Sequence, residues 1–206
     1  LEGNEIRVRR ALEGERIVTL DEQEYEMNPS NLVICDGVKP VALAGIMGGL
    51  NSEIRDTTHA LLFEAANFAR DSVRKTARSL GKASDSSSRF EKGVDEYSTV
   101  LGMKRALHLV QELGSAKVSA THLEVNTGNS LDPMPMKVSI RKVNGVLGIT
   151  VPDEEIYRIM ENLDFHPVIE GDELSLEIPA YREDLLSAGE GDVERYPDIA
   201  EEVIRM

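Results

Sequence analysis

Cysteine, aromatic residues and long apolar runs are scarce in this 206-residue sequence, and each shortage excludes a class of protein. The single cysteine, Cys35, excludes an internal disulfide and fits a reducing cytoplasm. No apolar run reaches the roughly 18 residues that a membrane-spanning helix needs, and no basic-then-apolar leader opens the chain. We therefore expect a cytoplasmic protein without membrane association. Because the first residue is Leu1 and not methionine, we also expect a piece of a longer chain.

Basic residues are also few, with 23 Lys and Arg against 37 Asp and Glu and a formal net charge of −14. Taken alone, this balance argues against a nucleic-acid binder, because phosphate contacts require Lys and Arg, and no DNA partner is expected. The charge is uneven, however, since residues 68–92 carry a local +4 and residues 183–202 a local −7. Each patch is either a solvated face or a site, basic for RNA and acidic for a metal ion or a basic partner.

The common catalytic motifs are missing. No histidine lies near a serine in a G-x-S-x-G setting, so we interpret Cys35 and the four histidines, His59, His108, His122 and His166, as structural. Residues 45–49 lack the Gly-Lys-Ser/Thr ending of a phosphate-binding loop. They form either a tight turn or a place where a ligand approaches exposed backbone, since glycine has no side chain in the way.

The first 125 residues alternate between strand and helix signals. Apolar–polar alternation and short apolar runs predict strands at 5–9, 16–20, 32–35, 40–44, 61–63 (this one buried) and 117–125. Helical spacing of apolar residues predicts helices at 69–80, with Gly81 as C-cap, and at 95–113. Residues 126–135 are nearly all turn formers or polar, and they indicate a linker with a domain boundary near residue 130.

A second, compact unit follows this linker. Its pattern predicts a strand at 136–140, a helix at 152–163, a hairpin of 168–170 with 173–178, and a last helix at 198–206. We therefore predict a two-domain α+β protein.

Two groups of carboxylates stand out chemically. Asp198, Glu201 and Glu202 are spaced to lie on one helical face, where like charges repel unless a cation offsets them, and Asp184 could join them. Such oxygen ligands suit Mg²⁺ or Ca²⁺, although the spacing alone favours a solvated helix start over a metal site. Glu64 ends the apolar run 61–63, so it either faces solvent or has a specific partner, since burying a carboxylate is costly.

The order and spacing of several segments resemble the β subunit of bacterial-type phenylalanine–tRNA ligases over essentially the whole chain. The resemblance to the editing domain (B3/B4) rests on residues 44–49, 52–53, 56–58, 61–68, 74–78 and 88–95. The resemblance to the next domain (B5) rests on residues 144–148, 179–184 and 198–205. It implies a β-rich editing domain with two main helices at 1–128 and a small α+β domain at 136–206.

The family resemblance implies a hydrolytic site that removes tyrosine from mischarged tRNA(Phe). Glu64 and the backbone at Gly48 are implied to read the tyrosine hydroxyl. The Thr-x-Ala wall of the family's pocket corresponds here to Ser84 and Ser86, so the first hydroxyl is kept and a second is added. A histidine-containing segment that lines the family's site is expected to precede Leu1. No covalent nucleophile is implied, in agreement with the missing triad.

The resemblance also implies Mg²⁺ at an acidic cluster shared with the α subunit. The matching positions are Asp184, Asp198, Glu201 and Glu202. The implied partners are this α subunit and tRNA(Phe), while ATP is expected only in the parent enzyme. Three functions remain open: an editing hydrolase, a non-catalytic module that binds tRNA and the α subunit, and a metal-binding regulatory domain.

Overall fold

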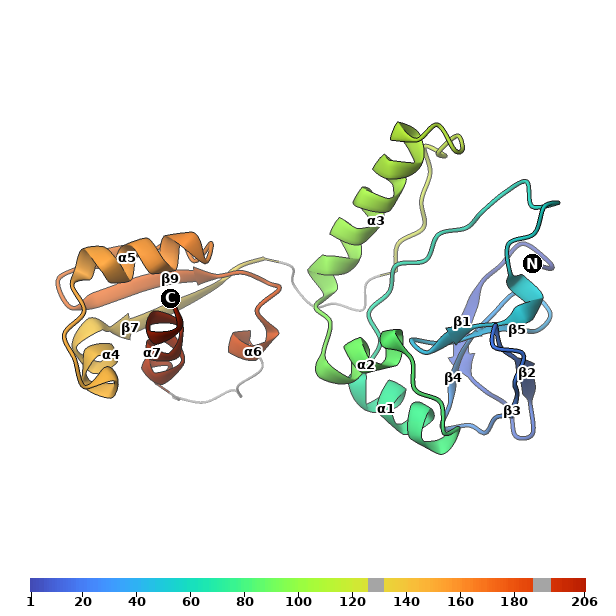
Figure 1. Ribbon diagram of the computed structural model, residues 1–206, viewed down its shortest axis with the longest axis horizontal. Coiled ribbons are helices and arrows are strands. Elements are labelled where there is room, and N and C mark those ends of the chain that lie inside the picture. The colour runs from blue at the N-terminus through green and yellow to red at the C-terminus, as the bar shows by residue number, and fades with distance from the viewer. Residues whose placement is uncertain (126–131, 187–193) are drawn as a thin grey trace. The chain divides into compact units, whose positions relative to one another are not determined.

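The computed structural model describes the chain in three ranges, 1–125, 132–186 and 194–206. Helices and antiparallel sheets alternate along it, which confirms the predicted α+β class (Figure 1). Within these ranges, no helix is both long enough and apolar enough to cross a membrane.

The chain divides into two compact units. Unit 1 comprises residues 1–94 and 98–116, and unit 2 comprises residues 95–97 and 117–206.

A four-stranded antiparallel sheet forms the centre of unit 1. Its strands lie in the order β1–β4–β5–β6, with bounds Arg7–Arg10, Leu32–Cys35, Pro40–Leu43 and Met47–Gly48. β4 and β5 are the most buried strands because their residues are nearly all apolar. The strands predicted at 32–35 and 40–44 are confirmed, and β1 overlaps the strand predicted at 5–9.

A second hairpin in unit 1 pairs β2 (Arg16–Val18) with β3 (Glu24–Glu26). Its turn is tied to the main sheet, because Thr19 forms a β-bridge with Gly49 and the backbone N–H of Leu20 donates to the Gly48 carbonyl. β2 lies within the strand predicted at 16–20, whereas β3 was not predicted. A short 3₁₀ turn, η1 (Leu50–Ser52), follows the sheet.

Two helices cover this sheet. α1 (Arg70–Ser79) confirms the helix predicted at 69–80, and it buries Val73 and Ala77 in the core that includes β4 and β5. α2 (Asp85–Lys92) was not predicted, and it packs against α1. Figure 1 shows the two helices together at one end of the strands.

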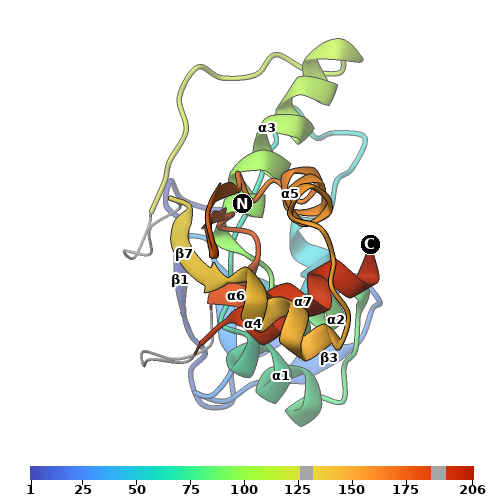
Figure 2. The ribbon, with the colours of Figure 1, turned by 90° about the vertical axis from the view of Figure 1, so that its left-hand side faces the viewer.

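α3 (Glu96–Glu112) confirms the helix predicted at 95–113, but none of its residues is buried. Beyond its first residues it belongs to unit 1, where it extends away from α1 and α2 (Figures 1 and 2). The apolar face predicted for this helix therefore stays largely exposed, as at Leu101, Leu109 and Leu113.

The buried strand predicted at 61–63 is wrong. Leu61, Leu62 and Phe63 are 52%, 66% and 41% exposed, and the whole stretch 53–69 forms no helix or strand. A short apolar run becomes a strand only where a neighbouring strand pairs with it, and none of the described residues does so here. The strand predicted at 117–125 is wrong for the same reason, with Leu123 and Val125 almost fully exposed.

Unit 2 is built on a three-stranded antiparallel sheet. Its strands lie in the order β7–β9–β8, with bounds Met134–Ser139, Glu173–Ile178 and Val168–Glu170. Burial alternates along β9, where Leu174, Leu176 and Ile178 point into the core, as expected for a sheet covered on one face. The predicted hairpin is confirmed with its bounds.

Helices supply the rest of the core of unit 2. Apolar side chains of α4, α5 and α7 join those of β7 and β9 in one cluster, with helix bounds Ile140–Leu147, Asp153–Asn162 and Tyr196–Arg205. α5 confirms the helix predicted at 152–163, and α7 confirms the last helix but begins two residues earlier. α4 and the short α6 (Glu183–Leu186) were missed. The predicted linker lies partly outside the described residues, and its end, Met134 and Pro135, belongs to β7.

Candidate functional site

Three of the four predicted pocket residues of unit 1 lie around the turn at Gly45. Gly45 has a φ of +70°, and a Cβ atom there would lie 2.9 Å from Cγ2 of Val73 and 3.1 Å from the Phe68 ring. A side chain is therefore excluded both by conformation and by space. Because of this close packing, α1 and Phe68, which precedes it, contact the turn that leads into Gly48.

Ser84 and Ser86 attach the beginning of α2 to this turn. The Ser84 hydroxyl donates to the Ile46 carbonyl at 2.7 Å, and the Ser86 hydroxyl donates to the Gly45 carbonyl at 3.0 Å. Ser84 is also the N-cap of α2, since its Oγ accepts from the Ser87 backbone N–H in a reciprocal capping box. Both hydroxyls therefore already have partners in the fold.

Gly48 lies in β6, two residues beyond Ile46. Its carbonyl accepts the Leu20 backbone N–H at 3.0 Å, which leaves one oxygen lone pair for a ligand. Leu20 lies close enough that a Cβ at Gly48 would be 3.3 Å from its Cδ1. Three of the four predicted pocket residues, Gly48, Ser84 and Ser86, are thus gathered around the turn formed by residues 45–48.

An ion pair that was not predicted from the sequence joins two segments of the same region. Lys82 Nζ lies 2.5 Å from Asp21 Oδ2, and both side chains are largely shielded from solvent. Lys82, together with the Thr19 hydroxyl, lowers the pKa of Asp21 to about 2. This bridge joins the β2–β3 turn, which contacts Gly48, to the loop that leads into Ser84. No local signal in the sequence connects residues 61 positions apart.

Glu64 is placed differently from the other three. It lies in the irregular stretch 53–69 and is exposed, so it does not end a buried strand as predicted. Burial among the surrounding protein atoms nevertheless raises the pKa of its carboxyl above the ordinary value. Among the described residues it makes no hydrogen bond or ion pair. No hydrogen bond among the described residues joins Glu64 to Gly48, Ser84 or Ser86.

The four predicted metal ligands of unit 2 are each faced by an arginine. Arg182 Nη2 lies 2.8 Å from Asp184 Oδ2 and 2.6 Å from Glu202 Oε1, so the guanidinium bridges these two carboxylates. Arg182 holds the pKa of the Asp184 carboxyl below its ordinary value. Its guanidinium also stacks 5.2 Å from the Phe165 ring centre. The bridge connects α6 to α7 over the core of unit 2.

The remaining two carboxylates have weaker partners. Asp198 lies 3.5 Å from Arg195, and Glu201 lies 3.4 Å from Arg205. Glu202 is buried while Glu201 is exposed, so the predicted common face is divided between core and solvent. In the part of the chain that the structure describes, no three His, Cys, Asp or Glu side chains could hold a metal ion together. As arranged here, these carboxylates are engaged by arginines and do not fit Mg²⁺.

Known protein families define the class of both units. Residues 1–115 match the family model of the B3/4 domain, and residues 136–206 match that of the tRNA synthetase B5 domain. The chain therefore consists of two domain types found together in one class of aminoacyl-tRNA synthetase subunit.

Curated relatives make the assignment specific. The phenylalanine–tRNA ligase β subunits of Geobacter metallireducens and Syntrophus aciditrophicus are 39% and 38% identical over all of this chain and 25% of their own length. That of Bacillus subtilis is 38% identical over 98% of this chain and 24% of its own length. The chain belongs to the family of phenylalanine–tRNA ligase β subunits, and it spans about a quarter of the length of these relatives.

One solved structure also matches. An N-terminal fragment of the phenylalanyl-tRNA synthetase β subunit from Pyrococcus horikoshii aligns with 98% of this chain and 55% of its own chain, with a TM-score of 0.46 and 13% sequence identity.

Proposed function

We propose that this chain forms part of an editing site that hydrolyses mischarged Tyr-tRNA(Phe). The observation that carries the proposal is the convergence of Ser84 and Ser86 on the carbonyls of Ile46 and Gly45, which lie two and three residues before Gly48. Residues that the family resemblance assigns to one pocket, although separated by more than 30 positions in the sequence, are thereby held on one turn.

A hydrolytic site of this kind would improve the discrimination of tyrosine from phenylalanine. An apolar synthetic pocket rejects a substrate with an added hydroxyl by only about 10²-fold, so discrimination of tyrosine from phenylalanine benefits from a second, hydrolytic site. That second site must bind the phenol hydroxyl of tyrosine and offer phenylalanine no comparable interaction. Glu64 suits this role because its exposed carboxylate makes no hydrogen bond or ion pair among the described residues, so it can accept a hydrogen bond from the phenol hydroxyl.

The reaction is the hydrolysis of an aminoacyl ester. Water attacks the ester carbonyl, the bond to the terminal ribose oxygen breaks, and the ribose hydroxyl and free tyrosine are released. The proposed role of this chain is to recognise the phenol and to hold the ester beside the turn formed by residues 45–48. No covalent intermediate is required.

In the wider enzyme we propose the setting that the family resemblance implies. The partners are an α subunit and tRNA(Phe), the compartment is the cytoplasm, and ATP is used only in the synthetic site of the parent enzyme. Mg²⁺ at Asp184, Asp198, Glu201 and Glu202 would require these side chains to leave their arginine partners.

The experiment follows deacylation of preformed Tyr-tRNA(Phe) by the full heteromeric enzyme with and without Glu64→Ala. We expect the substitution to slow deacylation at least tenfold, which corresponds to about 1.4 kcal/mol of transition-state binding. Glu13→Ala is the matched control, because Glu13 is an exposed glutamate in unit 1 outside the proposed pocket. It should leave the rate unchanged.

The second candidate is a non-catalytic module that binds tRNA and the α subunit. The hydroxyls of Ser84 and Ser86 favour it, since both are already engaged by backbone carbonyls. If wild type and Glu64→Ala both deacylate as slowly as buffer, the scaffolding function stands and editing is refuted. If both are equally fast, editing is real and the role given to Glu64 is wrong.

A further inference from the structure

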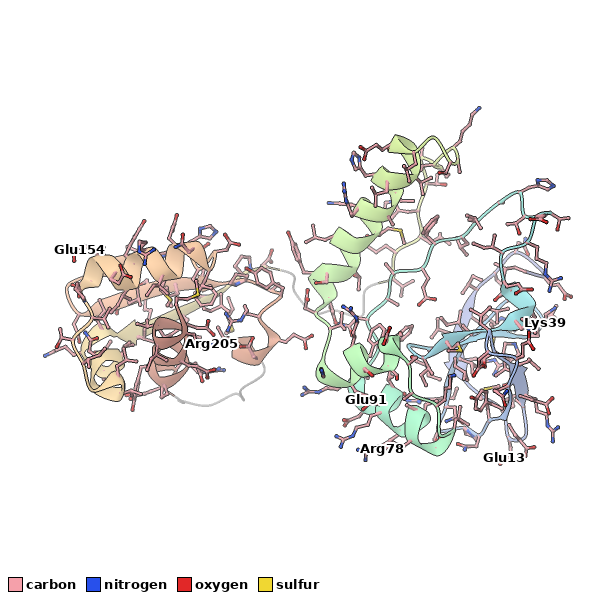
Figure 3. All side chains as sticks on the ribbon, in the orientation of Figure 1. Glu13, Lys39, Arg78, Glu91, Glu154 and Arg205 are labelled. Carbon is pink, nitrogen blue, oxygen red and sulfur yellow. The ribbon has the colours of Figure 1, made fainter. Side chains whose placement is uncertain are left out.

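The exposed sides of α1 and α2 carry an unusual set of cations. On α1, Arg70, Arg74 and Arg78 follow one another at four-residue spacing, which aligns them along one side of the helix about 6 Å apart in rise. Lys75 on α1, and Arg89 and Lys92 on α2, extend this surface, and all six side chains are exposed. Figure 3 shows the α1 side chains, Arg78 among them, projecting outward from the core of the unit.

These six cations form no ion pair with any residue that the structure describes. The contrast with the rest of the chain is sharp, because acidic residues outnumber basic ones by 37 to 23 and most other Lys and Arg side chains are paired. Lys82 lies between α1 and α2, and its pairing with Asp21 shows that a carboxylate partner is available even there. Unpaired cations are therefore concentrated on α1 and α2, although α3 also carries two, Lys104 and Arg105.

The position of this surface relates it to the proposed editing site. α2 begins at Ser84, whose hydroxyl binds the Ile46 carbonyl, and α1 and α2 pack against each other. A polymer whose end lies at the turn formed by residues 45–48 therefore has these helices within its reach. The inference rests on the proposed function in this respect, since editing delivers the end of a tRNA to that turn.

The side chains indicate which part of a nucleic acid is recognised. Arginine binds phosphate through paired N–H groups, and contacts to the backbone position a nucleic acid without reading its bases. Stacking on bases would need exposed aromatic rings, and the two rings that pack beside these helices do not provide them, because Phe68 is buried and lies 5.3 Å from Phe90, which is itself half-buried. We propose that the exposed faces of α1 and α2 bind the phosphate backbone of RNA.

The test measures binding of an uncharged tRNA(Phe) transcript to the full 206-residue chain between about 50 and 200 mM salt. The variant is Arg74→Gln with Arg78→Gln, whose side chains make no hydrogen bonds among the described residues. We expect affinity at low salt to fall about tenfold or more. The slope of log K against log salt should fall by about 1.4 to 1.8, the value for two lost phosphate contacts.

The matched control is Lys104→Gln with Arg105→Gln on α3, which removes two cations that are also exposed and unpaired among the described residues. We expect less than a twofold change. Equal weakening by both pairs would mean diffuse attraction and would overturn the proposal, as would no weakening by the α1 pair. If heparin competes as well as RNA with the same dependence on Arg74 and Arg78, the surface binds any polyanion and the assignment to RNA fails.

A second measurement separates this inference from the editing proposal. In the full enzyme, Arg74→Gln with Arg78→Gln should raise KM for deacylation of Tyr-tRNA(Phe) and leave kcat unchanged. If the enzyme deacylates and KM does not move, the RNA surface is refuted while editing stands. If no deacylation occurs but tRNA binding depends on these arginines, editing is refuted and the RNA surface stands.

Discussion

The two candidate sites differ in whether their charged side chains are paired within the chain. In unit 2 each of the four predicted metal ligands faces an arginine, and one of these arginines bridges two carboxylates. In unit 1, Glu64 and the six cations of α1 and α2 have no charged partner among the described residues. Charges that are paired within the chain are occupied by their partners, whereas unpaired charges are available to a ligand. The carboxylates of unit 2 are therefore engaged within the chain as it stands, whereas Glu64 and the six cations of unit 1 are not.

Arg182→Met should give the largest effect on stability. It leaves Glu202, whose side chain is only 10% exposed, without its main partner, and it removes the stacking on Phe165. Removing one member of a buried ion pair costs about 3 to 5 kcal/mol, and the exposure of Asp184 suggests the lower end. Hydrogen exchange of the α7 amides measures this loss in unit 2 directly.

Arg205→Met serves as the control for that comparison. Its side chain is 65% exposed and lies 4.0 Å from Glu202, so its removal should change stability by less than about 0.5 kcal/mol. Equal effects of Arg182→Met and Arg205→Met would show that the pairing in unit 2 is not structural. Added Mg²⁺ should leave exchange in the wild-type chain unchanged, because Arg182 already bridges Asp184 and Glu202.

Ser84→Ala tests whether the serines of unit 1 are structural or open. Because Ser84 caps α2 and binds the Ile46 carbonyl, we expect a loss of about 1 kcal/mol in urea unfolding. Ser84→Thr keeps the hydroxyl and should retain most of that stability. Ser88→Ala, at an exposed position of the same helix, should be nearly neutral. A neutral Ser84→Ala would mean that this hydroxyl is free for a ligand.

Local periodicity accounts for the part of the fold that the sequence predicts. The hairpin at 168–170 and 173–178 and the helix at 69–80 were predicted because alternation or helical spacing was complete within each segment. α2 was missed because three of its eight residues are serines, which are weak helix formers. Its formation depends on the capping box and on contacts with the turn at Gly45, which lies some 40 positions away in the sequence.

The contacts of the candidate site also could not be predicted from local sequence patterns. Gly48, Ser84 and Ser86 entered through a family resemblance, and only the structure shows that Ser84 and Ser86 bind consecutive carbonyls. The Asp21–Lys82 bridge and the Arg182 bridge could not be predicted from the sequence, because each joins segments through tertiary contacts. The apolar run 61–63 was misread because apolar residues report a tendency to bury, but not whether a partner strand is present.

Glu64→Gln should give the smallest effect, and its sign is informative. A carboxyl whose pKa is raised by burial in the folded state costs stability above that pKa, and the cost disappears as the pH falls below its unfolded value of about 4.3. Removing the charge should therefore raise Tm at pH 7 by on the order of 1 °C and have no effect near pH 4. Glu13→Gln should change neither value. A lower Tm for Glu64→Gln would reveal a stabilising partner and break the comparison between the units. A higher Tm combined with lost deacylation would mean that the fold tolerates an unfavourable charge for the sake of its ligand.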